Sequence, residues 1–419
     1  MSFRKRVVIQ THPLLSKMNA QKINDILNSL ARLVAENRQE IINANKLDIA
    51  ACPVDDAVIF DRLKVDETKI EQMSASIKSV IDAPNPVGKI ISSHTRLDDL
   101  KIKNKAVPFG TILIIYEARP DVSIEAAIIA LKAGNKILLK GGKEARNTNL
   151  CLADLWQKAL EENDADTDFV RYLDFSREQT RQLICGETEK FDLVIPRGGK
   201  SLIDFVIKNS RVPVIVSGRG NNFAYVDVEA DFEMAVKIIL DGKQRLSVCN
   251  ALDKVLINAN IHDFENKLRM LTKALLDKKI EVFGDKTIIK LSAQNIQPIE
   301  CEDIWAEEFL AAKIVIGTVS DVQEAIEKIN RYSGGHSAVI ITKNDETAER
   351  FLGEVDCAAV YHNASTRFTD GGEFGLGAEI AISTQKLHFR GPLGAEHLLT
   401  NKWFVYGEGQ VRNQELFFK

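Results

Sequence analysis

The stretch Thr111-Ile112-Leu113-Ile114-Ile115-Tyr116 has the composition of a fully buried β-strand. A second apolar run, Lys136-Ile137-Leu138-Leu139-Lys140, follows after a helical segment at 123–132. Near-continuous apolar strands that alternate with helices are typical of a parallel sheet covered by helices on both faces. The alternation continues over three more segments, a helix at 144–161 and strands at 191–195 and 213–216. The sequence therefore predicts an α/β unit built on a parallel sheet.

The same alternation restarts after Asp227 and predicts a second α/β unit. Its helices are expected at 231–243, 263–278, 321–331 and 345–354, and its strands at 254–258, 313–317, 337–342 and 358–362. Upstream of both units, apolar residues at helical spacing predict amphipathic helices over 20–50 and around 70–80. The 94–106 segment alternates between apolar and polar residues and is interpreted as an exposed β flap. The tail after Gly391-Pro392 is expected to supply a partner strand for it.

The length, composition and net charge are those of an ordinary globular protein. The chain has 419 residues, 45% of them hydrophobic and 27% charged, and a net charge of -4, so no basic surface for nucleic acid is expected. Six cysteines occur without a CxxC pair, and the histidines lack metal-ligand spacing, so no metal site is predicted. The basic start of the chain is followed by too short an apolar run for a signal peptide. No run reaches membrane-spanning length, and we expect a cytoplasmic protein.

Cys249 is the candidate nucleophile, within Gln244-Arg245-Leu246-Ser247-Val248-Cys249-Asn250-Ala251. It lies between an amphipathic run and an apolar segment that is expected to form a strand. Nearby positive charge or a helix N-terminus lowers the pKa of a thiol from about 8.5 and activates it for attack on acyl carbon. The alternative is a structural cysteine, because free Cys is among the most buried residue types.

Two glycine-rich turns are candidate phosphate sites. Lys140-Gly141-Gly142-Lys143 and Arg197-Gly198-Gly199-Lys200 each follow an apolar strand and open a helix, where the helix N-terminus favours an anion. Each turn alone can equally be a solvated connection, but two of them in consecutive strand–helix units favour a dinucleotide. The paired lysines 140 and 143 suit the extra phosphate of NADP. The polar, glycine-rich loop 363–379 is either a binding rim, with Arg367 for a carboxylate, or an irregular surface loop.

Taken together, several strings resemble the γ-glutamyl phosphate reductase (glutamate-5-semialdehyde dehydrogenase) family, a branch of the aldehyde dehydrogenase superfamily. The resemblance covers residues 19–412. Besides the stretches quoted above, it is carried by Tyr116-Glu117-Ala118-Arg119-Pro120, Ile329-Asn330-Arg331-Tyr332-Ser333-Gly334-Gly335-His336-Ser337, Ile382-Ser383-Thr384-Gln385-Lys386 and Arg390-Gly391-Pro392.

The resemblance implies a fold of two Rossmann-like parallel-sheet α/β domains plus a small β flap for oligomerisation. The NADP-binding domain would comprise residues 1–93 and 107–227, the catalytic domain 228–391, and the flap 94–106 with 392–419. The implied reaction is the NADPH-dependent reduction of L-glutamate 5-phosphate to L-glutamate 5-semialdehyde, with release of phosphate, in proline biosynthesis. Cys249 would attack the acyl phosphate, and hydride would reduce the resulting thioester.

The resemblance also suggests roles for individual residues. Catalysis is expected from Cys249 and Asn250, with the backbone N–H of either residue as an oxyanion donor and the side chains of Asn222 and Asn250 as further candidates. Cofactor binding is expected from Lys140, Gly141, Lys143, Arg197, Gly198, Gly199, Lys200, Glu308 and Phe374. Glu308 matches a glutamate that holds the nicotinamide ribose. Substrate binding is expected from Arg119, Arg245, Ser365 and Arg367. A homo-oligomer is implied, and the lability of glutamate 5-phosphate suggests a partnership with glutamate 5-kinase.

Two rival functions stay open. An aldehyde dehydrogenase that oxidises a small aldehyde needs a general base to hydrolyse the thioester, and the 214–220 stretch before the cysteine carries no carboxylate, which favours reduction. A degenerate homologue that serves as a binding protein is the second rival. It is suggested by departures from the family text at Asp121 and over 217–223, while the intact cysteine string argues against it. Further departures from the family text at Lys243 and Leu246 bear on substrate geometry and rate.

Overall fold

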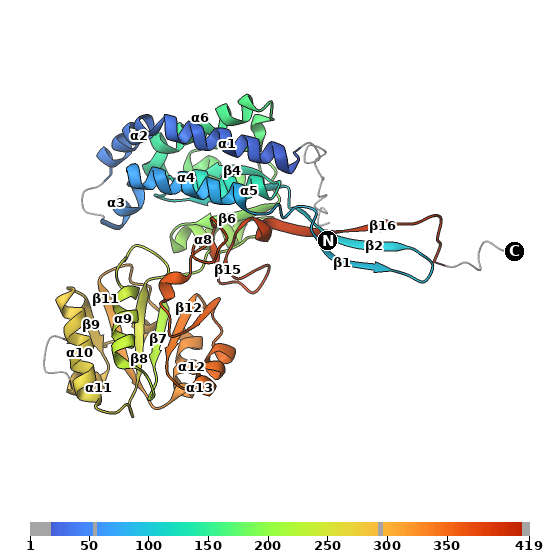
Figure 1. The fold of residues 1–419 in the computed structure, drawn as a ribbon. Coiled ribbons are helices and arrows are strands. Elements are labelled where there is room, and N and C mark those ends of the chain that lie inside the picture. The colour runs from blue at the N-terminus through green and yellow to red at the C-terminus, as the bar shows by residue number, and fades with distance from the viewer. Residues whose placement is uncertain (1–17, 53–56, 292–295, 413–419) are drawn as a thin grey trace, which may run out of the picture.

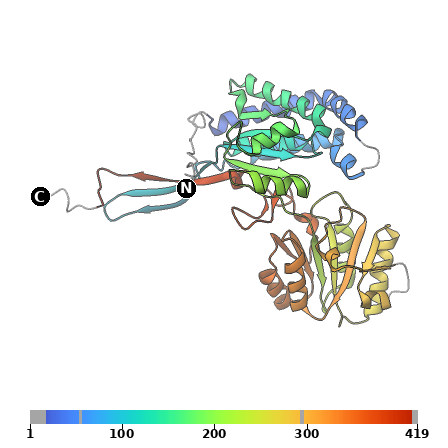
Figure 2. The same cartoon turned by 180° about the vertical axis from the view of Figure 1, so that it is seen from behind.

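The computed structural model describes residues 18–52, 57–291 and 296–412. Two α/β units lie one above the other in Figure 1, and a long three-stranded arm extends from between them. The same arrangement is seen from behind in Figure 2. The predicted fold class, two parallel-sheet α/β units plus a small β flap, is confirmed.

The first unit contains a four-stranded parallel sheet in the order β5-β4-β3-β6. Its strands are β3 (Thr111–Tyr116), β4 (Lys136–Lys140), β5 (Val170–Tyr172) and β6 (Leu193–Arg197). Its helices are α1 (Ala20–Glu36), α2 (Arg38–Ala50), α3 (Ala57–Leu63), α4 (Glu67–Asp82), α5 (Val122–Lys132), α6 (Arg146–Glu162), α7 (Arg177–Ile184) and α8 (Lys200–Asn209), with 3-10 turns η2 (Lys143–Ala145) and η3 (Thr167–Phe169). Side chains of α1, α4, α5 and α6 bury one face of the sheet, and those of α7 and α8 the other.

The second unit contains a seven-stranded parallel sheet in the order β10-β9-β11-β8-β7-β12-β13. The strands are β7 (Asn222–Val226), β8 (Leu252–Asn258), β9 (Glu281–Gly284), β10 (Ile296–Pro298), β11 (Lys313–Val319), β12 (Ser337–Ile341) and β13 (Ala359–His362). The helices are α9 (Phe232–Gly242), α10 (Phe264–Asp277), α11 (Lys286–Leu291), α12 (Val322–Tyr332) and α13 (Asp345–Glu354), with the 3-10 turn η4 (Glu302–Ala306). Helices α9, α10 and α11 cover one face, and α12 and α13 the other.

The arm is an antiparallel sheet of β1 (Ile90–Thr95), β2 (Lys101–Pro108) and β16 (Leu399–Tyr406), with β2 in the middle. The expected pairing of the tail with the 94–106 segment is therefore present. The chain reaches the arm through four short elements, η5 (Thr366–Phe368), β14 (Ile382–Ser383), β15 (Gly391–Pro392) and η6 (Ala395–Leu398).

Several segments differ from the sequence expectation. The sequence did not predict α3, α7, α11, β5, β9 and β10, and two further segments are placed differently. The apolar run 213–216 forms only an isolated bridge, Val194 to Val214, rather than a strand. Strand β7 lies in the second sheet, between β8 and β12, although its residues precede the expected boundary at Asp227. The segment begins with the polar residues Asn221 and Asn222, which disfavour a strand. Its pairing with the apolar strands β8 and β12 stabilises the strand nevertheless. Among the described residues, no helix has the length and apolarity that crossing a membrane requires.

Candidate active site

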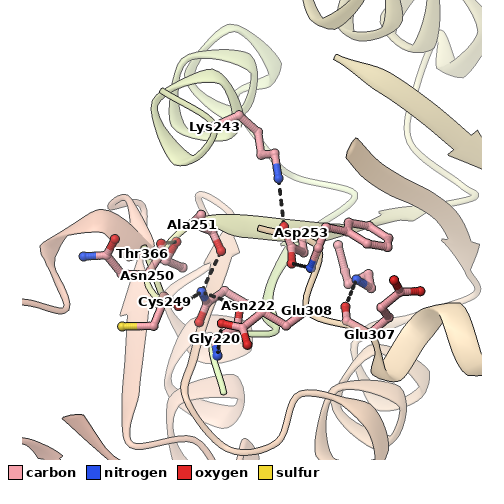
Figure 3. A network of polar contacts seen from close by, with 12 residues as sticks. Gly220, Asn222, Lys243, Cys249, Asn250, Ala251, Asp253, Glu307, Glu308 and Thr366 are labelled. Atoms are coloured by element: carbon pink, nitrogen blue, oxygen red, sulfur yellow. Dashed lines mark hydrogen bonds and ion pairs between the residues drawn. The ribbon is translucent and has the colours of Figure 1, made fainter. Parts of the chain in front are cut away.

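Cys249 lies in the turn between α9 and β8, at the amino ends of β7 and β8. The first residue of β7, Asn222, donates from Nδ2 to the carbonyl oxygens of Cys249 and Ala251, both at 2.7 Å (Figure 3). Gly220 packs so closely on this turn that a Cβ there would overlap the Cys249 carbonyl. The backbone of the candidate nucleophile is thus fixed by its neighbours on both sides.

The Cys249 thiol is held neutral in the ligand-free protein. Burial, together with the charges of Glu379 and Glu308, raises the pKa of this thiol to about 11, while Arg119 and Arg197 oppose the shift. The expected activation by a helix N-terminus is absent, because Cys249 follows the C-terminus of α9 and is followed by a strand. Attack by Cys249 therefore requires a partner that removes its proton.

The side-chain amides of Asn250 and Asn222 are both engaged. Asn250 donates from Nδ2 to the carbonyl oxygens of Arg367 at 3.0 Å and Thr369 at 3.1 Å, and Arg367 donates from Nη1 to its Oδ1. These bonds attach the 366–369 turn to the cysteine turn. Within the described part of the chain, no hydrogen bond engages the backbone N–H of Cys249 or Asn250. These two backbone groups, rather than the side-chain amides, are free to receive an oxyanion.

A buried cluster of charged residues, which the sequence did not reveal, surrounds the thiol. Burial raises the pKa of the Glu379 carboxyl to about 8, against the charge of Arg197, and the pKa of Glu125 to about 7. Asp121 is 3% exposed and forms an ion pair with Lys69, and its Oδ1 has no partner among the described residues. Burial tends to raise the pKa of the Asp121 carboxyl, but Lys69 and Arg119 outweigh it and lower that pKa. The departure at Asp121 was the only sequence signal for this cluster.

Arg197 and Glu379 explain how the cluster forms. Arg197 ends β6, and its Nη1 is buried without a partner among the described residues. It was predicted with the cofactor residues, yet its charge acts on Cys249 and Glu379. Glu379 accepts from the backbone N–H of Gly371 at 3.0 Å. Residues far apart in the sequence thus meet beside the thiol, which no local pattern can indicate.

The first glycine-rich turn lies at the carboxyl end of β4. Lys140 is half-buried, and its Nζ donates to the carbonyl of Gly141. Burial lowers the pKa of the Lys140 ammonium, while Asp174 and Glu144 oppose this shift. Lys143 is exposed. The carboxylate of Glu144 accepts from the backbone N–H of Ala118 at 2.6 Å and so links this turn to the end of β3.

The second turn, Gly198-Gly199, precedes α8 at the carboxyl end of β6. Here the Glu117 carboxylate accepts from the backbone N–H of Gly199 at 2.8 Å. A negative group thus already lies where the sequence places a pyrophosphate. Lys200 is exposed, and its Nζ lies 3.6 Å from the carboxylate of Asp204. A Cβ at Gly199 would meet only Glu117 Oε2, at 3.9 Å, so an anion could approach this turn once Glu117 turns away.

The remaining predicted residues lie in three places. Glu308 accepts from the backbone N–H of Gly220 at 2.9 Å, and burial raises the pKa of its carboxyl. Arg119 contacts the Ser247 carbonyl at 3.5 Å and Arg245 is 3.8 Å from Asp61, which brings both to the cysteine turn. Ser365 is buried, and its hydroxyl accepts from the backbone N–H of Arg367. The ring of Phe374 is 45% exposed. Among the described residues, no group of three His, Cys, Asp or Glu side chains could hold a metal.

Comparisons with known proteins identify the family of this chain. The aldehyde dehydrogenase family model matches residues 9–282 and 297–377. A γ-glutamyl phosphate reductase from Dictyoglomus thermophilum is 43% identical over 402 residues, which cover 95% of this chain and 96% of that protein. One from Clostridium beijerinckii is 44% identical over 395 residues, covering 93% and 94%. The chain belongs to the γ-glutamyl phosphate reductases of the aldehyde dehydrogenase family.

Solved structures place this γ-glutamyl phosphate reductase family member within a wider fold. The crystal structure of γ-glutamyl phosphate reductase from Thermotoga maritima superposes with a TM-score of 0.88 at 40% identity, covering 95% of this chain and 96% of that one. An acetylating aldehyde dehydrogenase from Geobacillus thermoglucosidasius shares the fold, with a TM-score of 0.69 at 17% identity. The family implies a nicotinamide cofactor. The Gly199 turn, where Glu117 Oε2 is the only neighbour of an added Cβ, and the partly buried cation Lys140 fit such a dinucleotide.

Proposed function

We propose that this chain reduces L-glutamate 5-phosphate to L-glutamate 5-semialdehyde with NADPH, releases phosphate, and acts in proline biosynthesis in the cytoplasm. The observation that carries the proposal is the Cys249 turn, whose free backbone N–H groups and adjacent arginines suit an anionic acyl phosphate. Family membership at more than 40% identity supports the same reaction.

In the first step the Cys249 sulfur forms a bond to the acyl carbon while the bond from that carbon to the phosphate oxygen breaks. The thiol proton leaves with the phosphate, which removes the obstacle of a thiol pKa of about 11. The backbone N–H groups of Cys249 and Asn250 stabilise the oxyanion of the tetrahedral stage. Arg119 and Arg197, whose charges already act on the thiol, offset the phosphate charge.

In the second step the thioester on Cys249 is brought to the aldehyde level by a hydride, which a reduced nicotinamide would supply when bound. The same backbone N–H groups stabilise the second oxyanion. As the aldehyde leaves, the carbon–sulfur bond breaks and Cys249 takes up a proton. Glu379 is the candidate proton donor, because the pKa of its carboxyl is raised to about 8 and its charge acts on the thiol.

Lys140 and Lys143 are proposed to hold the 2'-phosphate of NADP, and Glu308 the nicotinamide ribose. Gly198, Gly199 and Lys200 would lie near the pyrophosphate. Of the predicted substrate residues, Arg119 and Arg245 lie at the cysteine turn, while Arg367 already holds Asn250. We also propose that the arm mediates a homo-oligomer and that the chain contacts glutamate 5-kinase. Light scattering of wild type and an arm-deleted variant, and a pull-down with the kinase, test these two points.

The reverse reaction tests the main proposal, because the acyl phosphate is labile. Purified protein receives glutamate 5-semialdehyde, NADP and phosphate, and the absorbance of NADPH is followed. Reduction of NADP that requires phosphate, is lost in Cys249→Ala and is kept in Cys357→Ala supports the proposal. Cys357 is a matched control, since burial also raises the pKa of its thiol to about 11. Equal rates of NADP reduction with and without phosphate would favour an oxidising aldehyde dehydrogenase. Folded protein that binds NADPH but reduces no NADP would favour the degenerate binding protein.

A further inference from the structure

Three charged side chains are buried at the amino end of β8 and in the segment before it. Lys243, Asp253 and Lys254 are 5%, 1% and 0% exposed. Lys243 reaches from the end of α9 and donates from Nζ to Oδ1 of Asp253 at 2.8 Å (Figure 3). The desolvation of a buried ion pair often cancels its attraction, so such a pair is a weak source of stability. Lys243 is also a position at which the sequence departs from the family text.

These residues contact the backbone on both sides of Glu308. The second oxygen of Asp253, Oδ2, accepts from the backbone N–H of Phe309 at 2.8 Å. Lys254 donates from Nζ to the carbonyl of Glu307 at 2.7 Å and lies 3.8 Å from the centroid of the Phe309 ring. Every contact comes from the first two polar residues of β8, so the 307–309 segment is fixed relative to that strand.

Glu308 continues the chain of contacts toward the nucleophile. Its Oε1 accepts from the backbone N–H of Gly220, and Gly220 packs against the Cys249 carbonyl. Asn222, two residues later, donates to the same carbonyl. The cysteine turn, the 220–222 segment and the 307–309 segment therefore form one hydrogen-bonded assembly (Figure 3).

We propose that Asp253, with its charge balanced by Lys243, is a positioning residue that orients the Glu308 carboxylate for the nicotinamide cofactor by fixing the Phe309 N–H. The inference rests on the proposed function for the role of Glu308. Lys254 assists by fixing the Glu307 carbonyl. Without an acceptor at position 253, the Phe309 N–H loses its partner and the 307–309 segment gains freedom to turn, which moves Glu308 away from Gly220.

Two double variants isolate the acceptor from the charge. Lys243→Met with Asp253→Asn removes both charges but keeps a side-chain oxygen for the Phe309 N–H. Lys243→Met with Asp253→Leu is also neutral and similar in volume, but it has no acceptor. The dissociation constant for NADPH is measured by fluorescence without substrate. We expect the Leu double variant to bind NADPH about tenfold more weakly than the Asn double variant, the order expected when the Phe309 N–H loses its acceptor.

A merely structural role is excluded by combining each double variant with Glu308→Ala, which removes the side-chain oxygens that the proposal orients. If Asp253 acts through Glu308, the Leu and Asn backgrounds should bind NADPH equally once Glu308 is replaced. Equal binding by the two double variants before that replacement, or an unchanged tenfold difference after it, would overturn the proposal. If the Leu double variant does not fold, Lys254→Met replaces it, and its effect should likewise vanish in the Glu308→Ala background. Wild-type protein that binds NADPH but forms no NADPH from semialdehyde, NADP and phosphate would contradict the proposed reaction and leave this binding comparison valid.

Discussion

In the first α/β unit the candidate polar groups follow the carboxyl ends of β3, β4 and β6, whereas in the second they gather before the amino ends of β7 and β8. At carboxyl ends, helix N-termini come next and favour anions, as at the start of α8. At the amino end of β8, the preceding helix presents its C-terminus, and the Cys249 thiol is neutral. One sheet edge is thus suited to hold phosphates, and the other to keep a nucleophile inactive until substrate arrives.

The largest effect on kcat that this contrast predicts comes from adding a methyl group at one sheet edge rather than at the other. Gly220→Ala should lower kcat about 100-fold or more, because its Cβ would displace the Cys249 carbonyl and misplace the nucleophile. Gly199→Ala, at the other edge, would bring its Cβ to 3.9 Å from Glu117 Oε2, so its effect should fall on the KM for NADPH, and kcat at saturating cofactor should change less than about twofold. Steady-state kinetics of both variants measure the difference. Similar losses in the two variants would contradict the contrast.

Alkylation of Cys249 in the ligand-free protein should rise about tenfold per pH unit from pH 7 to 9. The thiol pKa of about 11 lies above this range, so the thiolate fraction grows in proportion to hydroxide. In Glu379→Gln the rate at pH 9 should exceed that of wild type, because the carboxyl with a pKa of about 8 is charged there. The rate with iodoacetamide, followed by mass spectrometry of the Cys249 peptide, checks both points. A plateau below pH 8 would show that the thiol is already activated.

At the carboxyl end of β4, Lys140→Met should lower the preference for NADP over NAD about tenfold, since one charge-assisted contact to the 2'-phosphate is lost. Lys136→Met is the matched control, because Lys136 begins the same strand and pairs with Asp166. The ratio of kcat/KM values for the two cofactors is the measurement. An equal shift in both variants would assign the effect to net charge.

The smallest effect is expected at the start of α8. Glu117→Gln removes a negative charge from the Gly199 N–H and should tighten dinucleotide binding about two- to fivefold. Glu178→Gln removes a charge from the first turn of α7 and should leave binding unchanged. Isothermal titration with NADPH compares the two. Weaker binding in Glu117→Gln would mean that this carboxylate contacts the cofactor directly.

The sequence predicted most helices and strands because buried strands and amphipathic helices have strong local patterns, as at 111–116 and 136–140. It missed β7, because this segment begins with polar residues and is stabilised as a strand by pairing with its neighbours in the sheet. At the site it singled out Cys249 and both glycine-rich turns. The Glu379–Arg197 proximity and the contacts of Asp253 depend on tertiary packing between distant segments, so no motif or spacing could indicate them.

The arm has a consequence for how the chain is made. Strand β16 pairs with β2, and residues 378–381 and 393–399 complete the core of the first unit, where Asn135 donates to the Leu398 carbonyl. The second sheet, in contrast, uses one continuous stretch from β7 to β13. On the ribosome, the first unit must therefore wait for the last part of the chain, while the second can close earlier. We expect the usual order of folding, N-terminal part first, to be reversed in this protein.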